Sequence, residues 1–76
     1  MPDRTQISRK RVKLATADDH IASAESLIGR QLSLLGQLER EGHDIETAQS
    51  LLDTMRQSLQ QMHVHRQIIE GEPEAG

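Results

Sequence analysis

The chain has 76 residues, of which 34% are hydrophobic, and it contains no cysteine, phenylalanine, tryptophan or tyrosine. These counts exclude disulfide frameworks, thiolate zinc sites, cysteine nucleophiles and the stacking of bases on aromatic side chains. The length allows one small domain, and no apolar run exceeds two residues, so we expect neither a membrane span nor a signal peptide. The absence of cysteine fits a reducing compartment, and we expect a cytoplasmic protein.

Basic charge is concentrated at the start of the chain. Residues 1–14 carry five basic side chains against one acid, a net charge of +4, and the rest carries four arginines against eleven acids, a net charge of −7. We expect residues 1–15 to form a mobile basic arm, although Ile7 and Leu14 keep a heptad spacing that permits a helical extension. The arm is either a solubilising tail or a contact for phosphate or a protein partner. The residues for such a contact are Arg9, Lys10, Arg11 and Lys13.

A first helix is predicted over about residues 17–41, because apolar residues recur at alternating spacings of three and four. Thr16 followed by Asp19 resembles a capping box at the start of this helix. The heptad seam of the helix consists of Leu14, Ala17, Ile21, Ala24, Ile28, Gln31, Leu35 and Leu38.

Small residues form a second stripe along the same helix. This stripe is either a solvated face that tolerates glycine or a docking face that lets a partner helix approach closely. Its members are Ala22, Ser26, Gly29, Ser33 and Gly36.

A tight turn is predicted over residues 42–44. Gly42 is expected to hold a left-handed conformation at the end of the first helix, because glycine adopts a positive φ without strain. Asp44 is expected to cap a second helix over about residues 44–70, and residues 71–76 are expected to be disordered. The second heptad seam consists of Ile45, Ala48, Leu52, Met55, Leu59, Met62, Arg66 and Ile69.

Two helices of matched length joined by so short a turn predict an all-α, antiparallel hairpin. A lone hairpin covers only part of its apolar arc and has neither an aromatic anchor nor a disulfide, so we expect a homodimer, a four-helix bundle. A different helical protein is the alternative partner for the same surface. The predicted interface residues are Leu27, Ile28, Leu34, Leu35, Leu51, Met55, Leu59 and Met62.

Two polar residues interrupt the seams. Gln31, near the middle of the first helix, either sets the register of the pairing or is simply tolerated there. Arg66, near the end of the second helix, either has the same role or extends its charged head out of the seam.

The histidines and carboxylates form no recognisable metal or catalytic pattern. His63 and His65 lie two residues apart, so on a helix they point about 200° away from each other, and no third ligand lies four residues from either. Catalysis needs a pocket in which several groups converge, and a two-helix hairpin has none of its own. We therefore predict no metal, no cofactor and no enzymatic activity.

The stretch from His20 to Glu70 resembles small bacterial helical-hairpin proteins of unknown function. The residues that carry the resemblance are Leu38-Glu39-Arg40-Glu41-Gly42-His43-Asp44, Ala48, Leu51, Leu52, Leu59, His63, His65 and Arg66. The resemblance implies a bacterial cytosolic helical protein and carries over no functional residue. In architecture, though not in sequence, the hairpin is similar to the plasmid copy-number repressor of primer, a dimeric four-helix bundle that binds RNA, and such a likeness is a poor guide to function.

These patterns favour a small non-enzymatic interaction or regulatory module that acts through protein–protein contacts along its helix faces. The alternative is a nucleic-acid-associated protein that uses the basic arm. Its binding would be non-specific and strongly dependent on salt, because charge would be its only component.

Overall fold

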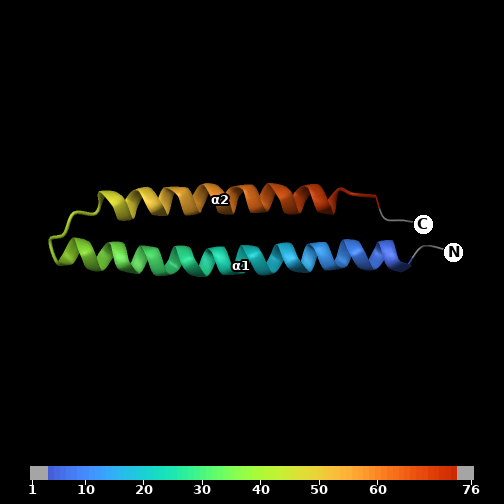
Figure 1. Cartoon of the computed structure of the whole chain (residues 1–76), viewed down its shortest axis with the longest axis horizontal. Helices are drawn as coiled ribbons and strands as arrows, with labels where there is room; N and C mark the ends of the chain where they lie inside the picture. The colour runs from blue at the N-terminus through green and yellow to red at the C-terminus, as the bar shows by residue number, and fades with distance from the viewer. Residues whose placement is uncertain (1–3, 74–76) are drawn as a thin grey trace.

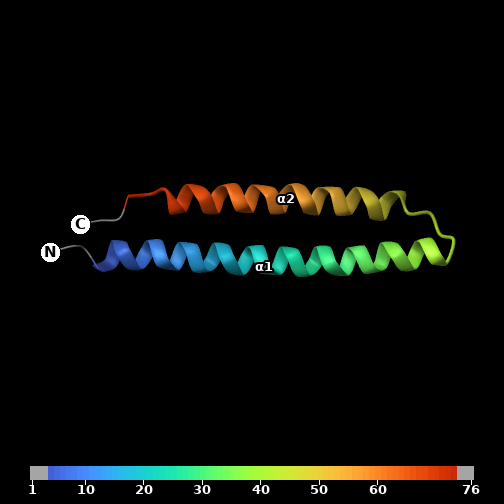
Figure 2. The same ribbon diagram turned by 180° about the vertical axis from the view of Figure 1, so that it is seen from behind.

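The computed structural model describes residues 4–73, which form two antiparallel helices lying side by side (Figures 1 and 2). Helix α1 spans Arg4–Arg40 and helix α2 spans Glu46–Glu70. The helices pack against each other, and the described range contains no strand. The predicted all-α hairpin is therefore confirmed at the level of a single chain.

The start of α1 corrects the prediction for the basic arm. The helix begins at Arg4, so the arm over residues 1–15 is helical wherever it is described, and a helix start near residue 17 is wrong. Thr16 is an exposed mid-helix residue and cannot act as a cap. The heptad phase continues toward the N-terminus instead, with Leu14 and Lys10 half-buried, and arginine and lysine are good helix formers. Residues 1–3 lie outside the described residues.

The two predicted heptad seams form the contact between the helices. All sixteen seam positions are buried or half-buried. Within residues 9–73, every other position is exposed except Lys10, Gly36 and Glu72. Alternating spacings of three and four therefore identified the core correctly, because they follow the period of the helix.

The core is a single layer of side chains between two helices. Its most enclosed residue, Ile69, is 4% exposed, and the other buried apolar residues are Ala17, Ile21 and Leu52. The hairpin measures 64 × 14 × 10 Å and has a radius of gyration of 17.9 Å, whereas a compact domain of this length has about 11 Å. Most apolar seam residues therefore keep one side open to solvent.

The end of α1 is closed by a Schellman motif, in which two backbone N–H groups bond back to carbonyls of the last turn. The N–H of Gly42 donates to Glu39 O at 3.1 Å, and the N–H of His43 donates to Leu38 O at 2.9 Å. Gly42 has a φ of 75°, which confirms the predicted left-handed conformation. The chain therefore reverses within a few residues.

Helix α2 begins two residues later than predicted. Ile45, not Asp44, occupies the N-cap position, and its carbonyl accepts from the N–H of Gln49 at 2.8 Å. The Asp44 carboxylate still satisfies one free backbone donor, since its Oδ1 accepts from the N–H of Glu46 at 3.0 Å. The helix ends at Glu70 as predicted, and residues 74–76 of the expected disordered tail lie outside the described residues.

Candidate interaction surface

On one side of the seam, each helix carries a line of residues spaced seven apart, which we call the leucine flank. The two lines adjoin, because Lys13 Nζ and Glu72 Oε2 form an ion pair at 3.3 Å. One heptad further, His20 and His65 line the same two hollows. The leucine flank consists of Lys13, His20, Leu27, Leu34 and Glu41 on the α1 side and Asp44, Leu51, Ser58, His65 and Glu72 on the α2 side.

Successive layers across this flank follow from the ion pair. In an antiparallel pair, each step of seven residues along α1 is matched by seven residues backward along α2. From the open end toward the turn, the layers are Lys13 with Glu72, His20 with His65, Leu27 with Ser58, and Leu34 with Leu51. Glu41 and Asp44 complete the series in the turn, after the last residue of α1 and before the first residue of α2.

The eight predicted interface residues fall into two groups. Leu27, Leu34 and Leu51 lie on the leucine flank and are 50%, 45% and 47% exposed. The other five lie in the seam beside them and are half-buried. The structure thus places all eight on the seam or on one side of it. The half-buried group consists of Ile28, Leu35, Met55, Leu59 and Met62.

Two open hollows lie around the histidine layer. One, of about 310 Å³, is lined by Val12, Thr16 and Ile69 among others, and the second, of about 330 Å³, reaches Ser58 and Met62. Both include Ala17 and the two histidines. Each imidazole can donate and accept a hydrogen bond, so this layer adds polar groups at the edge of an apolar stripe. Sequence spacing gave no sign of this layer, because His20 and His65 belong to different helices.

The opposite side of the seam, which we call the charged flank, has a different composition. Leu32 is its one large apolar residue in the described range, and it is 44% exposed. The charged flank consists of Arg11, Asp18, Glu25, Leu32 and Glu39 on α1 and Gln49, Arg56, His63 and Glu70 on α2.

Arg66 extends from the seam onto the charged flank. Its Nε donates to Asp18 Oδ1 at 2.5 Å, and its Nη1 pairs with Glu70 Oε1 at 2.9 Å. The hydrogen bond to Asp18, followed by that to Glu70, raises the pKa of Arg66 above its ordinary value. Of the two roles considered for Arg66, the structure shows the extended one, in which the charge leaves the seam.

Gln31 is the buried polar residue of the core, at 8% exposed. Its Nε2 donates to the Ala48 carbonyl at 3.0 Å, across the hairpin. Within the described range, no buried side-chain polar atom lacks a partner. This bond links one position on α1 to one on α2, which fits the predicted role in register.

The basic residues at the open end are partly neutralised by the chain itself. Arg9, Lys10 and Lys13 line a hollow of about 210 Å³ together with Glu72 and Pro73. Lys10 Nζ donates to the Glu72 carbonyl at 2.8 Å, and the Lys13 amine pairs with the Glu72 carboxylate. Three of the four predicted contact residues are therefore together, and Arg11 does not line this hollow. Glu72 was missed, because it belongs to the expected disordered tail.

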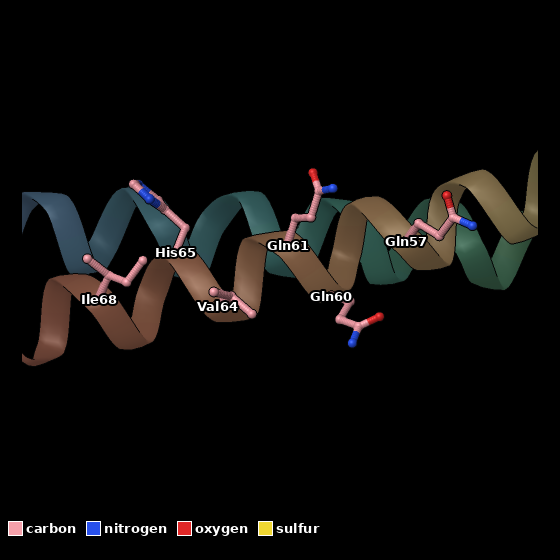
Figure 3. Close-up of a pocket in the computed structure, with 6 residues that line it drawn as sticks. All are labelled: Gln57, Gln60, Gln61, Val64, His65 and Ile68. Atoms are coloured by element: carbon pink, nitrogen blue, oxygen red, sulfur yellow. The ribbon is translucent and has the colours of Figure 1, made fainter.

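The outer face of α2 carries a shallow, glutamine-rich hollow (Figure 3). Gln57, Gln61 and His65 project from one edge of the helix, and Gln60 projects from the other. Val64 and Ile68 lie between these edges. This hollow presents amides, one imidazole and two aliphatic side chains.

The small-residue stripe lies away from α2. Four of its residues are exposed, and Gly36 alone is half-buried. A Cβ at Gly29 would meet no atom within 4 Å, so no backbone approaches this glycine in the hairpin. Of the two interpretations of the stripe, the solvated face describes the single chain.

The described residues also bear on metal sites and membrane spans. No group of three or more histidine, cysteine, aspartate or glutamate side chains is arranged to hold a metal ion in that range. Neither α1 nor α2 is long and apolar enough to cross a membrane. Comparisons with known protein families, with curated proteins and with solved structures find no match for this chain.

Proposed function

We propose that this protein is a small non-enzymatic interaction module that forms a homodimer, a four-helix bundle, through its leucine flank. The observation that carries the proposal is the asymmetry of the hairpin. Leu27, Leu34 and Leu51 are about half exposed on one side of a seam that is itself half covered. A second hairpin on that side would cover the leucines and the open edge of the seam together. Exposed apolar patches of this kind mark association surfaces.

The exposed area of the chain supports a partner of this size. The hairpin exposes 5879 Å², whereas a compact monomer of 8.5 kDa exposes about 4,700 Å². The excess is about 1,200 Å², and a standard protein–protein interface buries about 800 Å² on each partner. The excess belongs to the elongated chain as a whole, and it is large enough to supply one partner's share of such an interface. Two-fold symmetry is the commonest way for a chain to cover such a face with its own copy.

The test uses two leucines with nearly equal exposure on opposite sides of the seam. Leu34→Gln removes an apolar contact from the leucine flank, and Leu32→Gln is the matched control on the charged flank. Sedimentation equilibrium at micromolar concentration is expected to show a dimer whose dissociation constant rises at least tenfold in Leu34→Gln and changes little in Leu32→Gln. A folded monomer with a concentration-independent melt, or equal weakening by both variants, contradicts the proposal.

A second candidate function, contact with phosphate or nucleic acid, is favoured by the hollow that Arg9, Lys10 and Lys13 line. Because the Glu72 carboxylate neutralises Lys13, we expect Glu72→Gln to strengthen binding of a labelled random oligonucleotide. Lys13→Gln should weaken it, and binding should fall steeply between about 50 and 200 mM salt. Anisotropy titrations measure all three effects. Binding that is absent at low salt, or is insensitive to salt, rejects this candidate.

The setting of the protein is also a proposal. A cytoplasmic location is supported by the cysteine-free composition. A bacterial origin is supported by the resemblance of residues 20–70 to bacterial helical hairpins. An alternative helical protein partner would use the same leucine flank, and co-purification of a second chain in place of the homodimer would reveal it.

A further inference from the structure

The leucine flank has an internal pattern that limits how a second copy can dock. Two of its five layers are apolar or small, and they are adjacent: Leu27 with Ser58, and Leu34 with Leu51. On one side of this pair lies the histidine layer, and on the other lies the acidic layer of Glu41 and Asp44 at the turn. The pattern is thus different at its two ends.

Two flanks can face each other under two-fold symmetry in two ways. If the axis runs along the helices, both turns lie at the same end, and each layer meets its own copy with α1 over the partner's α2. If the axis runs across the helices, the turns lie at opposite ends, and α1 lies over the partner's α1.

Same-end docking opposes like charges. The acidic layer would meet a second acidic layer, so that Glu41 of one copy faces Asp44 of the other, and like charges directly opposed are destabilising. The histidine layer would meet a second histidine layer and gain no acceptor of opposite charge. The turn region has four acids, Glu39, Glu41, Asp44 and Glu46, against Arg40, so this end repels its own copy. Within the chain, His43 Nε2 lies 3.4 Å from Glu41 Oε2, and Asp44 Oδ1 accepts from the N–H of Glu46, so each carboxylate already has a contact of its own.

Opposite-end docking matches unlike layers. With the axis between the two central layers, Leu34 lies over Leu27 of the other copy, and Leu51 lies over Ser58 of the other copy. The same two contacts occur a second time, because the arrangement is symmetric. The same operation places His20 opposite the partner's Glu41, and His65 opposite the partner's Asp44. Each imidazole can then donate an N–H to a carboxylate oxygen, whatever its protonation state.

We infer that a second copy of this chain docks on the leucine flank with its turn at the opposite end. The axis passes between the Leu27 and Leu34 layers, and the two histidines contact the acids of the partner's turn. The inference rests on the proposed homodimer and names its orientation and register. Lys13 and Lys10 then lie about 10 Å and about 15 Å beyond the partner's acidic turn along the helix axis, close enough to attract it at low salt.

Disulfide cross-linking tests the orientation, because the chain has no cysteine of its own. Two mixtures share one variant: His20→Cys mixed with Glu41→Cys, and His20→Cys mixed with His65→Cys. Each mixture is oxidised at micromolar concentration, and the heterodimeric product is separated by mass. We expect the first mixture to give at least five times more heterodisulfide than the second, and each variant alone to give little.

The other outcomes overturn the inference in distinguishable ways. A dominant product from His20→Cys with His65→Cys means same-end docking, and the homodimer then stands while the inference fails. If neither mixture cross-links but sedimentation still shows dimers, the inferred register is wrong, and the comparison of Leu34→Gln with Leu32→Gln then shows whether the leucine flank is the interface. If neither cross-links and sedimentation shows monomers, the proposed homodimer itself has failed. Sedimentation of each unoxidised variant confirms that the substitutions have not dissociated or unfolded the protein.

Discussion

The leucine flank and the charged flank border the same seam, yet they carry opposite kinds of side chain. The leucine flank has three half-exposed leucines near its centre, whereas the charged flank has Leu32 alone among polar residues, most of which are charged. The seam by itself is enough to specify two paired helices. The difference between the flanks shows that the residues that pair the helices and the exposed leucines occupy separate positions of each heptad.

The largest expected effect comes from a substitution in the seam, because unpairing the helices disrupts the leucine flank and the charged flank together. Leu59→Asp places a charge at a half-buried position between the helices and should cost about 3 kcal/mol or more. Circular dichroism and sedimentation should show loss of helicity and of the dimer together. Gln60→Asp, at the neighbouring exposed position, is the control and should remain folded. A helical Leu59→Asp monomer would show that the hairpin is stable without its partner.

An intermediate effect is expected at the turn between the two helices. Gly42→Ala should lower the free energy of unfolding by about 1 kcal/mol, because a Cβ disfavours the left-handed conformation found there. Gly29→Ala has the opposite expectation, a gain of up to about 1 kcal/mol, since it lies mid-helix in open space. Urea denaturation measures both. Equal signs for the two substitutions would contradict the assigned turn geometry or the free outer face.

The smallest effect is expected on the charged flank. Asp18→Asn removes the charge of one of the two partners of Arg66, and solvent screens the pair, so the melting temperature should fall less than in Gly42→Ala. Asp19→Asn, the adjacent exposed acid, is the control. The difference between the two variants should vanish in 1 M salt, where the Debye length is about 3 Å. A difference that persists at that salt concentration would give this flank a larger role in stability than its exposure indicates.

The seams could be predicted from the sequence because helical periodicity depends on residue spacing alone. The identity of Gly42 gave the turn in the same way, since the left-handed conformation favours one residue type. The start of α1 was predicted wrongly, because the like charges of residues 1–14 were taken to favour a mobile arm over a helix. Arg4–Lys13 form a helix in which Lys10 and Lys13 are matched by Glu72, a partner 62 and 59 residues away in sequence.

The layers of the candidate surface could not be predicted from the sequence for a related reason. His20 and His65 become neighbours only when the register between the helices is known. That register depends on contacts such as the bond from Gln31 to the Ala48 carbonyl, whose acceptor belongs to the backbone and leaves no trace in residue type. The predicted interface leucines could be found without knowing the register. On each helix separately, they are apolar residues in addition to those of the seam.

Because the two helices are joined only at the turn, they pair and separate progressively along their length. The bond between Gln31 and Ala48 spans 17 residues, whereas the bond between Lys13 and Glu72 spans 59, so closing the outer contact costs about 1 kcal/mol more in chain entropy. Each layer touches only its neighbours, so the layers near the turn form first and the open end frays most often. Amide hydrogen exchange should therefore be fastest at the C-terminal end of α2 and slow toward the middle of the helix. The basic residues lie in the part that frays, and every such opening separates them from Glu72.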